Sequence, residues 1–174
     1  MKFREEIWLD WHKPVNASSV ELINYQSSRK NQIEQAGLIL DTVKAVHRTP
    51  CSILEIGPND GWMGKTLMEQ KWETITRYVM VDDELKLDLC RETMMGFNGM
   101  EFITIENVDL IQGRFNLFVA NHCLNETPLE YQEYICNRFF PVCDEVFILQ
   151  AVEERVIGRD VSEHHHQLIS HLNR

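Results

Sequence analysis

Apolar residues along this chain gather in five short runs, separated by longer stretches in which they recur every three or four positions. Each run is nearly continuous in apolar residues and does not alternate with polar ones. That pattern is typical of strands buried on both faces of a parallel sheet. The predicted strands cover residues 52–56, 78–81, 102–105, 117–120 and 146–149.

Stretches with helical spacing lie between these strands, at residues 62–71, 84–95 and 129–140. A further helix is expected before the first strand, because Ser18 and Glu21 have capping-box spacing and Thr49-Pro50 ends the pattern. A last helix is expected at 162–172. The alternation of strands and helices predicts a doubly wound α/β fold with a parallel sheet.

Length and composition narrow the class of protein. The 174 residues suit a single domain, with a lid and helix in 1–50, a ligand-binding core in 51–150 and a C-terminal helix in 151–174. The net charge of −10 argues against binding nucleic acid by neutralising phosphates. The five cysteines have no disulfide-framework spacing, and no signal peptide or membrane-length apolar run is visible. We therefore expect a cytoplasmic protein with no membrane or nucleic-acid partner.

The first strand runs directly into a glycine-bearing turn, which reads Glu55-Ile56-Gly57-Pro58-Asn59-Asp60-Gly61, and then into a helix. Glycine is needed where φ is positive or where a ligand approaches the backbone closely. The N–H groups at the start of the following helix favour an anionic group of a ligand. The segment therefore predicts a ligand-binding turn.

Two nucleotide-binding motifs fit this turn poorly. The second glycine of a dinucleotide fingerprint falls on Asn59. A phosphate-binding loop is suggested by Gly64-Lys65-Thr66, but its required first glycine also falls on Asn59. A nucleotide hydrolase therefore stays as an alternative with a defective motif.

The pattern Glu-x-Gly-x-x-x-Gly, formed by Glu55, Gly57 and Gly61, resembles the first motif of class I S-adenosylmethionine-dependent methyltransferases. The resemblance implies strand order 3-2-1-4-5, with helices on both faces of the sheet. It also implies that the turn holds the methionine part of the cofactor, that Glu55 lies near its ammonium group, and that the turn is lined by Pro58, Asn59 and Asp60.

The second predicted strand ends in two acids, Asp82 and Asp83, about twenty residues after the turn. This is the spacing of an acid that binds ribose hydroxyls, and a carboxylate can accept two hydrogen bonds from a diol. Asp82 is the first candidate and Asp83 the second. The alternative is that these acids only begin the next helix, where they complement its dipole.

Polar residues also follow the third and fourth strands. The resemblance implies an adenine-reading residue after the third strand, for which Asn107 fits best and Asp109 is the fallback. After the fourth strand, Asn121 is assigned to the cofactor. His122 and Glu126 are assigned to catalysis, because a histidine can take a proton from an acceptor hydroxyl near neutral pH. The alternatives are that His122 is a hydrogen-bonded histidine that packs beside the adenine, and that Glu126 only begins the next helix.

The expected function is methyl transfer from S-adenosylmethionine to a small-molecule hydroxyl. A short likeness to sugar O-methyltransferases over 121–139 suggests a sugar-like or natural-product acceptor. No metal is expected, since the acids are not clustered and the histidines at 164–166 and 171 lack i, i+4 spacing. The alternative to an enzyme is a non-catalytic scaffold that keeps the fold.

Class I methyltransferases usually continue past the fifth strand into an antiparallel strand pair, which we expect to be missing here because residues 151–174 look helical. The fifth strand would then be an exposed edge, at which we expect a homodimer or another partner to dock.

Overall fold

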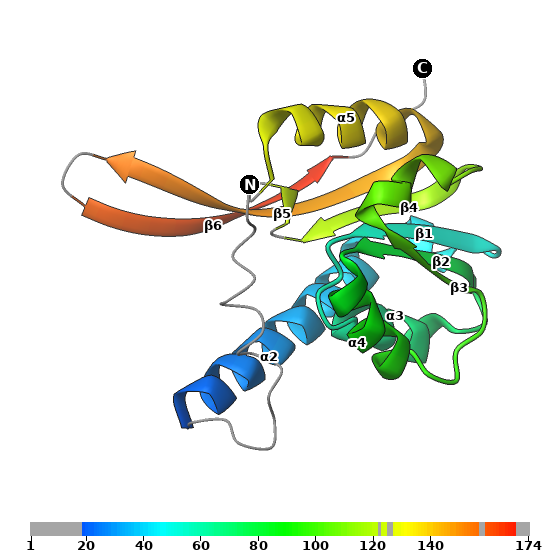
Figure 1. The fold of residues 1–174 in the computed structure, drawn as a ribbon, viewed down its shortest axis with the longest axis horizontal. Helices are drawn as coiled ribbons and strands as arrows, with labels where there is room; N and C mark the ends of the chain where they lie inside the picture. Colours follow the sequence, from blue (N-terminus) through cyan, green and yellow to red (C-terminus); the bar gives the residue numbers. More distant parts are fainter. Residues whose placement is uncertain (1–18, 122, 125–126, 157–158, 170–174) are drawn as a thin grey trace.

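The structure is a computed structural model that describes residues 19–121, 123–124, 127–156 and 159–169. Its sheet has the order β3-β2-β1-β4-β5-β6 (Figure 1). The first five strands are parallel and confirm the predicted order 3-2-1-4-5. Their bounds are Cys51–Ile56 (β1), Ile75–Asp82 (β2), Met100–Thr104 (β3), Phe115–Asn121 (β4) and Cys143–Val156 (β5), and β6 spans Arg159–Ile169.

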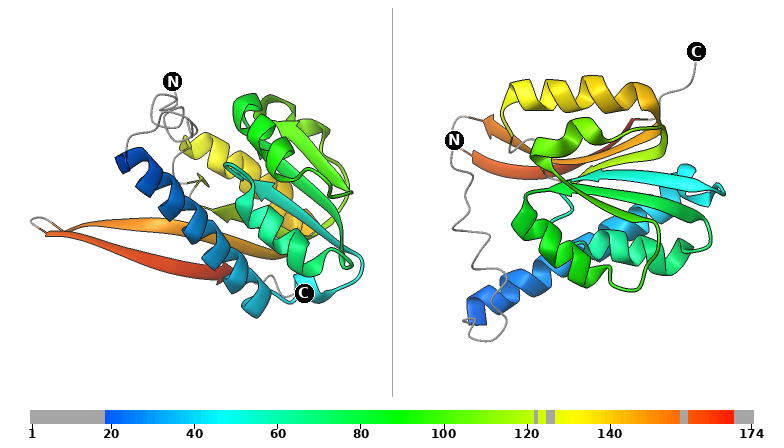
Figure 2. Two further views of the ribbon diagram at one scale, coloured as in Figure 1. Left: turned by 90° about the horizontal axis from the view of Figure 1, so that it is seen from below. Right: turned by 45° about the vertical axis from the view of Figure 1, so that its right-hand side comes forward.

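Helices cover both faces of this sheet, as predicted. One face carries α2 (Ser19–Thr42), α3 (Trp62–Lys71) and α4 (Glu84–Thr93), and the other carries α5 (Leu129–Phe139) (Figure 2). Successive residues of β1 point to opposite faces, so Ile53 packs under α2 and α3 while Leu54 packs under α5. Because both faces are buried, apolar residues dominate the centres of the strands.

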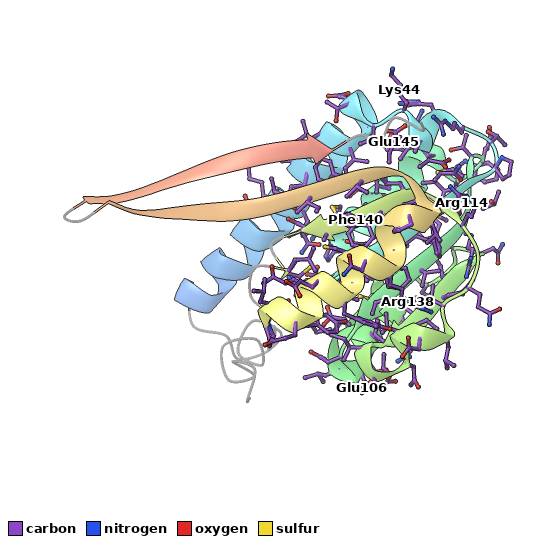
Figure 3. All side chains as sticks on the ribbon, turned by 90° about the horizontal axis from the view of Figure 1, so that it is seen from above. Lys44, Glu106, Arg114, Arg138, Phe140 and Glu145 are labelled. Carbon is purple, nitrogen blue, oxygen red and sulfur yellow. The ribbon has the colours of Figure 1, made fainter. Side chains whose placement is uncertain are left out.

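Short 3₁₀ helices join several of these elements. They are η1 (Ala45–His47), η2 (Ile105–Leu110) and η4 (Phe140–Val142). The end of α2 is fixed to the start of β5, since the backbone N–H of Lys44 donates to Glu145 at 3.1 Å (Figure 3). Arg48 adds an ion pair with Asp144 at 3.1 Å. Among the residues described, no helix is long and apolar enough to cross a membrane.

The C-terminal helix predicted at 162–172 is wrong. Residues of that segment form β6, which pairs antiparallel with β5 from Val146–Ile169 to Val156–Arg159. The pairing satisfies backbone groups along the side of β5 that faces away from β4, and such long-range pairing overrides local sequence pattern. One antiparallel strand is thus present where the sequence suggested that the antiparallel pair was missing.

The ribbon of β5 and β6 changes the expectation about the sheet edge. β4 pairs with β5 only as far as Leu149, and beyond it the two last strands extend past the sheet together (Figure 1). Since β6 covers the free side of β5, the exposed edge on which the predicted dimer rested does not exist there. The oligomeric state stays a prediction, and residues 1–18, which include the predicted lid, lie outside the described residues.

Candidate active site

The turn after β1 is tightly constrained by what packs against it. Gly57, Asn59 and Gly61 have positive φ angles of 71°, 61° and 79°. A Cβ atom on Gly57 would lie 2.3 Å from Cβ of Cys123, so only glycine fits there. Thiols contact the turn from two sides, because Cys123 donates to the carbonyl of Ile56 at 2.8 Å and Cys90 donates to that of Asn59 at 3.3 Å. The predicted turn therefore exists, and its shape is fixed by the end of β4 and by α4.

A buried glutamine of α2 holds the far side of this turn. Nε2 of Gln32 donates to Asp60 at 2.7 Å, and Oε1 of Gln32 accepts from the backbone N–H of Met63 at 3.2 Å. Gln32 and Asp60 are each only 5% exposed. Gln32 therefore satisfies one of the free N–H groups at the start of α3 and fixes the Asp60 carboxylate beside it.

Asp82 closes the turn from β2. Its carboxylate accepts from the backbone N–H of Asn59 at 3.4 Å and of Asp83 at 2.9 Å, and it lies 3.4 Å from Nζ of Lys86. Burial raises the pKa of Asp82, while Lys86 and the two N–H groups act in the opposite direction. The candidate ribose-binding acid is thus in contact with the glycine turn, where the sequence placed it.

Asp83 has a structural role in this molecule. It is the N-cap of α4, and its side chain accepts from the backbone N–H of Lys86 at 2.9 Å. This is the alternative that the sequence left open for the two acids, and it holds for the second of them.

Glu55 is buried in the core, with only 1% of its surface exposed. Its Oε2 accepts from the hydroxyl of Tyr78 at 2.8 Å. Burial raises the pKa of Glu55 to about 8; the Tyr78 hydrogen bond opposes this, and the nearby carboxylates of Asp82 and Asp60 add to it. Three acids from β1, β2 and the turn therefore lie within electrostatic reach of one another.

At the end of β4, Asn121 contacts α2. Its Nδ2 donates to Oε1 of Gln35, one helical turn from Gln32. In the part of the chain that is described, Oδ1 of Asn121 and Oδ1 of Asn59 are buried without a hydrogen-bond partner. Buried polar atoms are rarely left unpaired, so these two oxygens are candidate ligand contacts.

The other predicted residues either have contacts elsewhere or lie outside the described residues. Asn107, on η2, is exposed and donates its amide to Thr104 at 2.8 Å. His122 and Glu126, the predicted catalytic pair, lie outside the described residues. Gly64-Lys65-Thr66 forms part of α3, where Gly64 packs against Met80 and Tyr78.

The overall architecture is similar to that of solved structures whose sequences are only distantly similar to this chain. No protein-family model and no curated protein matches the chain. Magnesium protoporphyrin IX methyltransferase (ChlM) from Synechocystis PCC 6803, with bound SAH, matches with a TM-score of 0.62 at 10% identity, over 87% of this chain and 68% of that one. The pyocyanin biosynthetic protein PhzM gives 0.63 at 10% identity, over 86% and 45%. An O-methyltransferase family protein from Burkholderia thailandensis gives 0.57 at 12% identity, over 76% and 43%.

The chain has the class I methyltransferase fold. It spans about two thirds of the length of the first of these structures and less than half of the other two. At such identities the likeness shows the methyltransferase fold alone, so the activity has to be argued from the residues around the turn.

Sequence reasoning missed the contribution of α2 to this methyltransferase fold. On this helix the apolar Ile33 is 42% exposed, whereas the buried stripe runs through Gln32, Ala36 and Ile39. These three residues have helical spacing, so the sequence could have indicated the buried face of α2 if a glutamine had been accepted as one of its members. Polar residues on a buried helix face mark contacts with other buried polar groups.

Proposed function

We propose that this protein binds S-adenosylmethionine at the turn after β1 and transfers its methyl group to a small-molecule hydroxyl. The observation that carries the proposal is the group of buried acids around the turn: Glu55, Asp60 and Asp82. With Glu55 protonated, the carboxylates of Asp60 and Asp82 would still repel a phosphate, and they suit a ligand with an ammonium and a sulfonium group. ChlM, which has the same fold, was solved with SAH bound, and this supports S-adenosylmethionine as the ligand of the present protein.

The residues present fit such a cofactor. Asn59 and Asn121 each have a buried oxygen without a donor among the described residues, and both can accept from an ammonium group or a hydroxyl. Asp82 would accept from the ribose hydroxyls. Gly57 lets the backbone approach the ligand, and Pro58 and Gly61 complete the turn.

When bound, the cofactor supplies an activated methyl group on a sulfonium. The protein's part is to hold the acceptor in line with that methyl and to exclude water, which can supply much of the rate. In our proposal His122 removes a proton from the acceptor hydroxyl and Glu126 orients His122 or the acceptor. A sugar-like or natural-product acceptor and a cytoplasmic location remain parts of this proposal.

The test is calorimetric titration of the purified protein with S-adenosylmethionine and S-adenosylhomocysteine, with ATP and magnesium as the control ligand. We expect micromolar binding of the first two ligands and loss of more than tenfold in affinity in Asp82→Ala. Asp83→Ala is the matched control, because Asp83 caps α4 and should lower stability without a comparable loss of affinity.

Each outcome of the titration decides between functions. Binding of neither sulfur-containing ligand would overturn the proposal, and binding of ATP in their place would revive the hydrolase. Binding of both without methyl transfer, in a screen of sugar and phenol hydroxyl acceptors, would favour a non-catalytic protein that keeps the fold.

A further inference from the structure

The hydroxyl of Tyr131 on α5 is buried and has no hydrogen-bond partner among the described residues. Tyr131 lies in the first turn of α5, where its backbone N–H donates to the carbonyl of Pro128 at 3.0 Å. Its phenol oxygen is buried and makes no hydrogen bond with any residue that the structure describes. A tyrosine hydroxyl can both donate and accept, so both capacities are unused here.

Neighbouring contacts show which part of the sheet this face of α5 meets. Tyr134, whose ring centre lies 6.4 Å from that of Tyr131, hydrogen-bonds the carboxylate of Asp109 on η2. Arg138 donates to the carbonyls of Asp109 at 2.7 Å and Ile111 at 3.2 Å. This face of α5 is therefore tied to the segment that follows β3 (Figure 3).

Tyr131 itself lies among the carboxyl ends of several strands. Burial raises the pKa of Tyr131, and the groups of Cys123, Tyr134, Asp82 and Glu106 raise it further. Cys123 follows β4, Asp82 ends β2 and Glu106 begins η2 after β3. The phenol is thus protonated at neutral pH. Tyr131 packs against the apolar cluster that contains Val81 near the end of β2, and Ile103 on β3 and Cys123 after β4 pack against the same cluster.

The order of the cofactor's parts along the site then decides which of them can reach the hydroxyl of Tyr131. The turn after β1 would hold one end of the ligand, and Asp82 the ribose, so the base would extend past Asp82 toward β3. Asn107, the residue expected to read the base, is exposed and its amide is already bonded to Thr104. The hydroxyl of Tyr131, in contrast, is buried and has no hydrogen-bond partner in the part of the chain that the structure describes.

We propose that the hydroxyl of Tyr131 hydrogen-bonds an edge atom of the adenine ring, in place of Asn107. This inference rests on the proposed function, since it requires that the site binds S-adenosylmethionine. It makes Tyr131 a residue that selects the base of the cofactor.

The experiment is calorimetric titration of Tyr131→Phe with S-adenosylhomocysteine. Loss of one neutral hydrogen bond should weaken binding by about fivefold to tenfold. Tyr134→Phe is the matched control, because Tyr134 lies one turn along the same helix and its hydroxyl already bonds Asp109. Asn107→Ala should also leave the affinity unchanged.

Base-modified ligands identify the atom that is recognised. S-adenosylhomocysteine analogues with 1-deaza-, 3-deaza- and 7-deazaadenine, and with purine lacking the 6-amino group, each remove one edge atom. The wild type should lose affinity for one of the four, and Tyr131→Phe should bind that analogue as tightly as the wild type does. Since the substitution removes an unpaired buried hydroxyl, the Tm of the free protein should stay the same or rise.

The outcomes separate this inference from the proposed function. If the wild type does not bind S-adenosylhomocysteine, the proposed function fails and takes the inference with it. If the wild type binds but Tyr131→Phe binds equally well, or weakens every analogue by the same factor, the function stands and the adenine role of Tyr131 is wrong. A fall in Tm together with uniform weakening would show that Tyr131 only stabilises the fold.

Discussion

Replacing Glu55 with glutamine tests the electrostatics of the buried acids directly. Glu55 is 1% exposed, and its Oε2 accepts from Tyr78 at 2.8 Å. Glutamine has the same shape, keeps an oxygen for that hydrogen bond and cannot ionise. The substitution Glu55→Gln therefore removes the titration of this group with little change in packing.

The expected change in the free energy of unfolding follows from the pKa of Glu55. Burial raises the pKa of Glu55 from 4.5 to about 8, so the folded protein keeps a proton that the unfolded chain loses above pH 4.5. Unfolding thus becomes more favourable as the pH rises from about 4.5 to about 8, and constant above that range. At 1.36 kcal/mol per pH unit, Glu55 lowers the free energy of unfolding by roughly 4–5 kcal/mol at pH 8.

The assay is urea unfolding of the wild type and of Glu55→Gln at several pH values between 4.5 and 9. The variant should match the wild type near pH 4.5 and exceed it by several kcal/mol at pH 8, because other titrating groups cancel in the difference. Gly37→Ala, which changes no titratable group, should give a difference that does not change with pH. A difference for Glu55→Gln that is equally flat would refute the assignment of a buried, protonated carboxyl.

Two further substitutions test how the turn is held. Gly57→Ala should lower the free energy of unfolding by roughly 2–4 kcal/mol, because its Cβ would meet Cys123 and φ is positive, and should abolish calorimetric binding of S-adenosylhomocysteine. Gly37→Ala, in α2 with nothing near its Cβ, should instead raise it by about 0.5–1 kcal/mol in urea unfolding. Gln32→Ala should lower the free energy of unfolding by about 1–3 kcal/mol, because it leaves buried polar groups unpaired. Gln32→Glu should lower it more at pH 7 than at pH 4, since the new carboxylate would face Asp60. Equal losses of stability at the two pH values would contradict the contact between residue 32 and Asp60.

The strand centres could be predicted because burial on both faces leaves a plain apolar pattern, but the strand ends could not. The second strand was expected at 78–81 and spans Ile75–Asp82. Its added residues include Arg77, which has no apolar character and joins the sheet through a double hydrogen bond to Glu101 on β3, at 2.7 and 3.0 Å. A cross-strand pair of this kind depends on which strands are neighbours, and one strand's sequence does not contain that information.

The prediction of a helix in the C-terminal segment was wrong for a related reason. The sequence of 159–169 has no clear strand alternation, and its conformation follows from eleven residue pairs with β5. Those pairs form only once β5 is in place beside β4, so the deciding interaction is tertiary. The apolar core of β5, at 146–149, was found because it is buried within the sheet; the ribbon beyond Leu149 was not.

In the candidate site too, residues set by local conformation could be predicted, and residues set by tertiary contacts could not. Gly57 and Gly61 could be predicted, because their positive φ angles are a local property that leaves a mark in the sequence. Gln32 and Gln35 could not, because their function depends on where α2 crosses the ends of β1 and β4. Since Gln32 joins Asp60 to the start of α3, and Ala36 beside it is fully buried, this helix is part of the structure that shapes the turn. A motif match at 55–61 therefore specifies the conformation of the turn but not the groups that hold it, and these must be sought on a helix that ends before the motif begins.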